Sequence, residues 1–404
     1  MNKNSNNKIH YIPYMCDHSY VLEAASAHCG MIIKTLPPPD EETIDFDLPG
    51  VTGRECLPCF VTTNDILRQA KQPDFEPANS VFLMPRANGP CRFGQYVSLQ
   101  RDILDDHGLQ DMEIAVSCAG NSYQGFGDDP TKLRKLIWDG GLAVDMLQKL
   151  LHEYRPYEIH KGQADKIYHV GLDKIVQSTR EGGGKQLYHA VKWIVKEFEN
   201  LLVDRSEPRP IIGVIGEIYL RLNHHANQSI VRQVEDAGGE VRLASLMEWF
   251  YYTTWDYKEL TKVRGEYFEF FVTKLTDMYQ HYREHVVVKP AAHLLKQPYE
   301  TPIADLVKNV RSYYDSALGT EALLSIGKSV DLATHGASGI LNVMPFSCMA
   351  GIIAAGVGQR LRRDYKDIPW LDVIFESKGN TNITTRLEAF LYQATQYHRR
   401  IVLE

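Results

Sequence analysis

Seven cysteines are the residues of this sequence whose types and positions most directly suggest chemistry. They are Cys16, Cys29, Cys56, Cys59, Cys91, Cys118 and Cys348. Six of them fall within the first 118 residues. In a large cytosolic chain, cysteines more often bind metals, react or fill a core than form disulfides. Metal binding and thiol chemistry are therefore the first possibilities to consider.

Cys91 stands where a predicted strand gives way to a predicted helix. The apolar run Ser80–Pro85 is typical of a buried parallel strand, and helical spacing begins at Val97. Gly89 and Pro90 let the backbone approach a ligand closely, and free amides at a helix start favour negative charge. A thiolate or a thiolate-bound cluster is well placed at such a point.

Cys348 has the same context near the end of the chain. It follows a predicted strand over 339–344 and precedes a predicted helix that starts at Met349. In open α/β sheets, ligands bind beyond the carboxyl ends of the strands. Two domains that each supply such a cysteine would face each other across a cleft.

Cys56 and Cys59 form a C-x-x-C pair at a third predicted helix start. Iron–sulfur clusters need thiolates from several segments, and this sequence provides them. Zinc binding and thioredoxin-like chemistry remain alternatives, although no second pair of zinc ligands is present. Cys16 directly precedes a helix start at Asp17, whereas Cys29 and Cys118 are typical of small buried apolar residues.

The predicted elements alternate between strand and helix in two separate parts of the chain, which predicts an α/β fold with two parallel sheets. We expect a first Rossmann-like (flavodoxin-like) domain over 1–129, a helical connector over 130–205 and a second Rossmann-like domain over 206–404. The expected strands are 9–15, 31–35, 80–85, 112–118, 210–216, 240–243, 339–344 and 370–375.

Composition excludes several classes of function. Net charge is −7, with 51 acidic and 44 basic residues spread evenly, so nucleic acids and anionic membranes are poor partners. No apolar run is long enough to span a membrane, and the polar N-terminus predicts a soluble cytoplasmic protein.

Phosphate-binding motifs are missing as well. The glycines at 213 and 216 do not form a dinucleotide fingerprint, and the run Gly182–Lys185 lacks the P-loop spacing. We therefore expect no ATP hydrolysis by this chain. Glu217 and the pair His224 and His225 follow a predicted strand and are candidate polar cleft residues, while the aromatic stripe 249–271 is predicted to be packing.

Four motifs together resemble the 2-hydroxyacyl-CoA dehydratase and benzoyl-CoA reductase superfamily. They are Glu-Cys-Leu-Pro-Cys at 55–59, Gly-Pro-Cys-Arg-Phe-Gly-Gln-Tyr at 89–96, Gly-Glu-Ile-Tyr at 216–219 with Asn227, and Met-Pro-Phe-Ser-Cys-Met at 344–349. The resemblance extends over nearly the whole chain and is closest to the activator-linked branch related to the dehydratase component.

The resemblance implies an iron–sulfur protein whose cluster lies between two Rossmann-like domains. Electrons of low potential would come from a partner, an ATP-hydrolysing activator with its own [4Fe–4S] cluster. By position, Cys56, Cys91 and Cys348 correspond to cluster ligands, with Cys59 next. Gly89, Pro90 and Arg92 would border the cofactor, Arg92 offsetting its negative charge. Three thiolates leave one iron open for substrate.

With Cys16, Cys29, Cys59 or Cys118 added, six ligands could instead hold a double-cubane [8Fe–9S] cluster, as in related reductases. The resemblance thus implies an ATP-dependent iron–sulfur oxidoreductase acting on a small substrate, as a homodimer or heterodimer. Alternatives are a non-catalytic electron relay or scaffold and a subunit of a dehydratase-type enzyme. No CoA-binding signature is recognisable, and the sequence predicts no catalytic residue.

Overall fold

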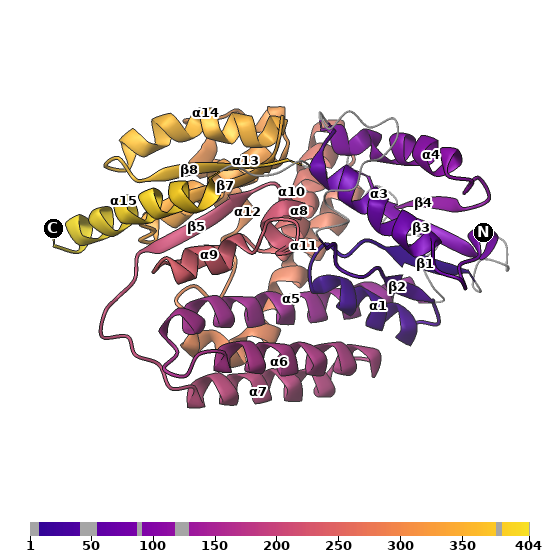
Figure 1. Ribbon diagram of the computed structural model, residues 1–404, viewed down its shortest axis with the longest axis horizontal. Coiled ribbons are helices and arrows are strands. Elements are labelled where there is room, and N and C mark those ends of the chain that lie inside the picture. The colour runs from indigo at the N-terminus through magenta and orange to yellow at the C-terminus, as the bar shows by residue number, and fades with distance from the viewer. Residues whose placement is uncertain (1–7, 41–54, 87–90, 118–128, 377–381, 404) are drawn as a thin grey trace.

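The computed structural model describes residues 8–40, 55–86, 91–117, 129–376 and 382–403. In this part of the chain, eight strands form two four-stranded sheets, and every strand pair is parallel. Figure 1 shows the two sheets on opposite sides of the molecule, with helices packed around each. The predicted α/β class with two Rossmann-like sheets is confirmed.

The first sheet has the strand order β2-β1-β3-β4. Its central strand β3 is buried from Ser80 to Met84, which explains its uninterrupted apolar sequence. The strands are β1 (Ile9–Ile12), β2 (Ile33–Thr35), β3 (Ser80–Pro85) and β4 (Glu113–Ser117), and the helices are α1 (His18–His28), α3 (Leu57–Ala70), η2 (Pro77–Asn79), η3 (Arg92–Gln95) and α4 (Tyr96–Asp106).

The second sheet repeats this topology in the order β6-β5-β7-β8. Its central strand β7 is buried along its whole length. The strands are β5 (Ile211–Gly216), β6 (Glu240–Leu243), β7 (Gly339–Pro345) and β8 (Trp370–Phe375), and the helices are α8 (Ile218–Leu222), α9 (Ile230–Asp236), α12 (Ile303–Val310), η7 (Ser316–Leu318), α13 (Glu321–Thr334), α14 (Met349–Asp364) and α15 (Ile383–Leu403).

Helices connect the two sheets, as the periodicity of 130–203 predicts. They are α5 (Pro130–Tyr154), η5 (Arg155–Tyr157), α6 (Gln163–Arg180) and α7 (Lys185–Asn200). A second helical group, inserted between β6 and β7, consists of α10 (Leu246–Arg264), α11 (Tyr267–Val288) and η6 (Lys289–Leu294). None of the helices described is long and apolar enough to cross a membrane.

The two halves share packing as well as topology. One apolar cluster contains Phe82 from β3 and Val214 from β5, so it extends from one sheet to the other. The buried side chain of Asn223 also donates a hydrogen bond to the carbonyl of Tyr14 at 3.0 Å. These contacts fix the loops at the carboxyl ends of both sheets relative to one another.

Candidate functional site

Three of the predicted cysteines each occupy the position just before a helix. Cys56 precedes α3, Cys91 precedes η3, which runs directly into α4, and Cys348 precedes α14. All three have extended backbone conformations, so the chain turns from extended to helical at the thiol. The Gly351 amide donates to Cys348 Sγ at 3.4 Å. Unpaired amides at such helix starts favour a negatively charged sulfur.

These three cysteines converge although they are far apart in the sequence. The Cys56 and Cys91 thiols are close enough for their charges to interact, and so are those of Cys56 and Cys348. Cys56 and Cys91 belong to the first α/β unit, whereas Cys348 follows β7 of the second. Arg92 Nη2 donates to the Phe346 carbonyl at 2.8 Å and so joins the two cysteine loops directly. The site therefore lies where the two halves meet.

Burial and nearby acids keep these thiols protonated. Burial raises the pKa of Cys56 and of Cys348 to about 12, and the charge of Glu217 acts in the same direction on both. Cys91 is exposed, yet partial desolvation raises its pKa as well. Thiols of this kind ionise when a metal supplies the positive charge, because metal ligation releases the proton. Three soft donors from three segments fit an iron–sulfur centre.

Two neighbouring side chains favour the ionised sulfurs. Burial raises the pKa of Cys56, Cys59 and Cys91, and the positive charge of Arg92 partly opposes that rise at all three thiols. The Tyr96 hydroxyl donates a hydrogen bond to the Cys56 sulfur, which also opposes the rise in the pKa of Cys56. Hydrogen bonds and charges of this type tune the potential of a thiolate-bound metal.

A pair of half-buried carboxyl groups completes the site. Glu217 directly follows β5 and caps α8, accepting from the amides of Tyr219 at 3.1 Å and Leu220 at 2.9 Å. Burial raises the pKa of Glu217. Burial and then the charge of Glu217 raise the pKa of Glu321 to about 8, so Glu321 holds a proton at neutral pH. The charges of both carboxyl groups raise the pKa of the Cys91 and Cys348 thiols.

Of this pair, sequence reasoning considered only Glu217, as a polar residue after a strand. Glu321 belongs to no motif, and its one local signal is the preceding Thr320, whose hydroxyl caps α13 by accepting from the Ala322 amide at 3.2 Å. His224 and His225 follow α8 and pack against the ring of Tyr14. Burial lowers the pKa of both histidines.

The remaining cysteines have different surroundings. Cys59 lies in the first turn of α3 and is buried, close enough to Arg92 and Tyr96 to interact with both. Cys29 packs among Ala25, Leu133 and Leu136, in keeping with a small core residue. Cys118, Gly89 and Pro90 lie outside the described residues, so their predicted roles remain predictions.

Cys16 belongs to a separate buried cluster. Its Sγ lies 3.4 Å from His18 Nδ1, and His18 Nε2 lies 2.9 Å from Asp145 Oδ1. Burial lowers the pKa of His18, but the charges of Cys16 and Asp145 outweigh burial and raise it well above its usual value. The apolar neighbours of Cys16 include Leu222 and Leu246. The described contacts of Cys16 thus lie with His18 and this cluster.

A single metal ion finds no site in the described ranges, since no three histidine, cysteine, aspartate or glutamate side chains there are arranged to hold one. The zinc alternative for Cys56 and Cys59 gains no support from these residues. A cluster differs in this respect, because each thiolate binds a different iron and the ligands stand farther apart than those of one ion.

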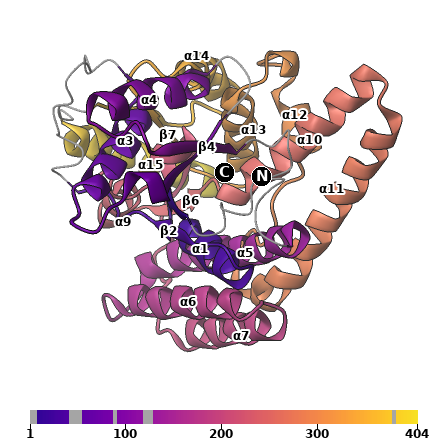
Figure 2. The ribbon, with the colours of Figure 1, turned by 90° about the vertical axis from the view of Figure 1, so that its right-hand side faces the viewer.

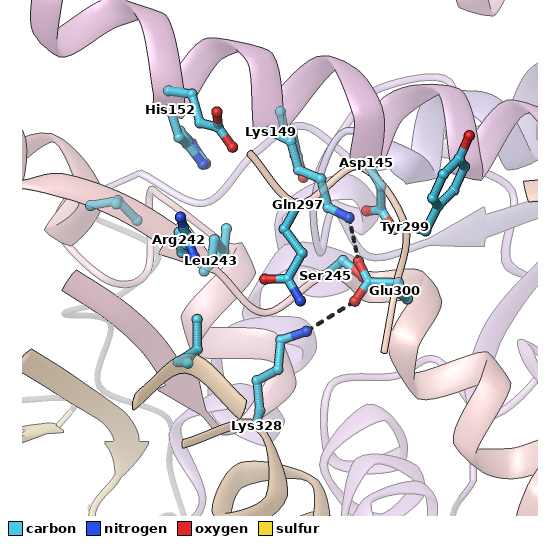
Figure 3. Close-up of a pocket in the computed structure, with 14 residues that line it drawn as sticks. Asp145, Lys149, His152, Arg242, Leu243, Ser245, Gln297, Tyr299, Glu300 and Lys328 are labelled. Carbon is cyan, nitrogen blue, oxygen red and sulfur yellow. Dashed lines mark hydrogen bonds and ion pairs between the residues drawn. The ribbon is translucent and has the colours of Figure 1, made fainter. Parts of the chain in front are cut away.

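A second candidate is a polar pocket between α5, β6, α13 and the segment 297–300 (Figure 3). Lys149 lies 2.7 Å and Lys328 3.0 Å from the carboxylate of Glu300, so these charges are paired within the chain. Burial lowers the pKa of His152 to about 3, which keeps that imidazole neutral. The pocket is a charge-balanced junction between the connector helices and the second sheet.

Comparison with models of known protein families and with curated proteins gives no match to this chain. The candidate site is therefore defined by the geometry of this chain's own residues.

Proposed function

We propose that the chain is an iron–sulfur reductase component that receives low-potential electrons from a separate ATP-hydrolysing activator and delivers them to a small bound substrate. The observation that carries the proposal is the 2.8 Å hydrogen bond from Arg92 to the Phe346 carbonyl, which joins the loops of Cys91 and Cys348, together with the electrostatic interaction of Cys56 with both thiols. The resemblance to the 2-hydroxyacyl-CoA dehydratase and benzoyl-CoA reductase superfamily, drawn from the motifs around these cysteines, supports it.

The chain's own residues have definable tasks in this function. Cys56, Cys91 and Cys348 would hold a cluster, which supplies one-electron chemistry when bound. Arg92 offsets negative charge at the sulfurs, and the Tyr96 hydroxyl bonds to the sulfur of Cys56. Glu321, whose pKa is raised by burial and by the charge of Glu217, would supply a proton beside the same thiols, where reduction of an organic substrate would require one.

Anaerobic reconstitution with iron and sulfide tests the proposal. We expect the wild-type protein to retain about four or eight irons per chain and to show cluster absorption and EPR signals. Cys91→Ser and Cys348→Ser should each lose most of the iron, because serine is a poor ligand for soft iron sites. Cys29→Ser is the matched control, since Cys29 packs among apolar side chains away from the three cysteines. An iron-free wild type, or equal iron in all four proteins, refutes the proposal.

A non-catalytic electron relay is the second candidate, favoured by the position of Cys59. This thiol shares Arg92 and Tyr96 with Cys56, so a fourth ligand stands near the other three. Four thiolates close a cubane, whereas three leave an iron open to substrate. Binding of exogenous ligands to the wild-type cluster distinguishes the two: binding supports the reductase, whereas no binding, together with loss of iron in Cys59→Ser, supports the relay.

A further inference from the structure

We propose that the hairpin of α10 and α11 binds a second copy of this chain, with α11 packing antiparallel against α11 of the copy. Figure 2 shows this hairpin projecting from the rest of the molecule. Its outward surface is apolar: Val263 is 85 % exposed, Tyr267 and Phe268 are each 77 % exposed and Tyr282 is 61 % exposed. Exposed apolar patches of this extent mark interaction sites.

The prediction that the aromatic stripe 249–271 is packing is wrong for its outer part, because Tyr267, Phe268 and Phe271 are exposed.

Before its last turn, where Val287 and Val288 are buried, the pattern along α11 is the reverse of that of an ordinary surface helix. Its inner face makes polar contacts: Asp277 pairs with Lys258 at 2.6 Å, and Glu284 accepts from the Tyr251 hydroxyl at 3.1 Å. Its outer face carries the aromatic and aliphatic residues. A helix that turns its apolar side away from its own protein is stabilised by a partner that covers that side.

The spacing of the outer face specifies what kind of partner covers it. Phe268, Phe271, Leu275, Met278 and Tyr282 follow one another at intervals of three, four, three and four residues. This is the seam of a two-helix coiled coil, in which apolar residues recur every 3.5 residues on average. The partner element is therefore another helix with a matching seam, and a second α11 has one.

The exposed area is sufficient for a stable contact. The residues concerned are Tyr267, Phe268, Phe271, Leu275, Met278, Tyr279 and Tyr282. At about 200 Å² per large side chain, their exposed fractions amount to roughly 800 Å². A standard protein interface buries about 800 Å² per partner. Aromatic and methionine side chains are also the types enriched in interface cores.

Charges select the antiparallel orientation. The first turn of the helix carries Glu269, preceded by Glu266, while its other end carries His285 and is followed by Lys289. An antiparallel pair centred on Leu275 brings the acidic end of one helix toward the basic end of the other, and opposes the two helix dipoles favourably. A parallel pair would bring like charges together.

Sedimentation velocity of the full-length protein from about 1 to 50 μM tests the proposal. We expect a wild-type dimer, and a dissociation constant raised by about 100-fold or more in the double variant Phe271→Glu, Met278→Glu, because buried charges oppose the contact. Tyr392→Glu, at a 67 % exposed position on α15, is the control and should leave the dimer unchanged. Near-UV circular dichroism verifies that each variant is folded.

Cysteine cross-linking tests the orientation. Leu275→Cys should form an inter-chain disulfide on mild oxidation, because Leu275 lies at the two-fold axis. Tyr267→Cys should form no more cross-linked dimer than wild type. In two antiparallel copies this position lies about 24 Å from its counterpart, at 1.5 Å per residue. A wild-type monomer, binding of wild type to neutral phosphatidylcholine vesicles in place of self-association, or an unaffected double variant overturns the proposal. Equal cross-linking at both positions overturns the antiparallel arrangement. None of these measurements requires bound iron.

Discussion

Lys328→Met tests the buried charge network that joins the second sheet to the connector helices. Lys328, on α13, is 8 % exposed and lies 2.9 Å from Glu248 and 3.0 Å from Glu300. Burial lowers the pKa of this amine, but the charges of Glu248 and Glu300 outweigh burial and raise it above its usual value. Methionine fills a similar volume without charge, so the variant leaves Glu248 buried without its cation.

The loss of one partner from such a network costs about 3–5 kcal/mol. For a chain of 404 residues, a loss of about 4 kcal/mol lowers the melting temperature by about 5 °C. Urea denaturation at pH 7, followed by far-UV circular dichroism, measures the free energy directly. Lys258→Met is the matched control because Lys258 pairs with Asp277 at 2.6 Å in a partly exposed position, where we expect a loss of about 1 kcal/mol or less.

Two further results sharpen the test. Addition of Glu248→Gln to Lys328→Met should restore part of the lost stability, because the uncompensated charge is removed. The deficit of Lys328→Met should also shrink as the pH falls, since Glu248 has a raised pKa and becomes neutral. A deficit below about 1 kcal/mol, or one equal to that of Lys258→Met, would show that the network contributes no more than a surface ion pair.

Two other predictions concern the elements that position the site. Gly216→Ala should destabilise the protein by about 3 kcal/mol or more, because Gly216 has φ +115° and an added Cβ would collide with the Val343 carbonyl. The control Gly265→Ala, in the left-handed region with φ +73° and open space around the Cβ position, should cost only about 1 kcal/mol; equal losses in urea denaturation would contradict the argument. Asp65→Asn tests pH dependence, since burial raises the pKa of Asp65 to about 8. Because the pKa of Asp65 is higher in the folded than in the unfolded state, the free energy of unfolding of wild type falls as pH rises from about 4 to 8. Asparagine does not titrate, so its free energy of unfolding does not fall in this way. Relative to wild type, the variant should therefore become more stable between pH 5 and pH 9, by at most about 4 kcal/mol. A difference in the free energy of unfolding that does not change with pH would show that titration of Asp65 is not its cause.

The strands and the helix starts could be predicted because their signals are local. Strands 240–243 and 370–375 are found at the predicted residues, since the first alternates charged with apolar side chains and the second is mostly apolar. The prediction that Cys91 and Cys348 stand between strand and helix depended on the same signals, and the structure places each just before a helix.

Other features depend on three-dimensional packing and could not be predicted in the same way. Glu217 and Glu321 interact across about a hundred residues of sequence, and no short motif links a strand end to the start of α13. The aromatic stripe from 249 into α11 has helical spacing whether its outer face is covered or exposed. Spacing identifies an apolar face, and only the positions of the other helices reveal whether the same chain covers it.

The chain order of the three converging thiols has a consequence for biosynthesis. Cys56 and Cys91 emerge from the ribosome early, whereas Cys348 follows Cys91 by 257 residues (348 − 91). At about 5–20 residues per second, this interval takes about 13–50 seconds. During that time the first half can fold with its thiols unligated. Any group held by all three can thus be inserted only after Cys348 has been synthesised, by a delivery system that meets a chain whose first half has had time to fold.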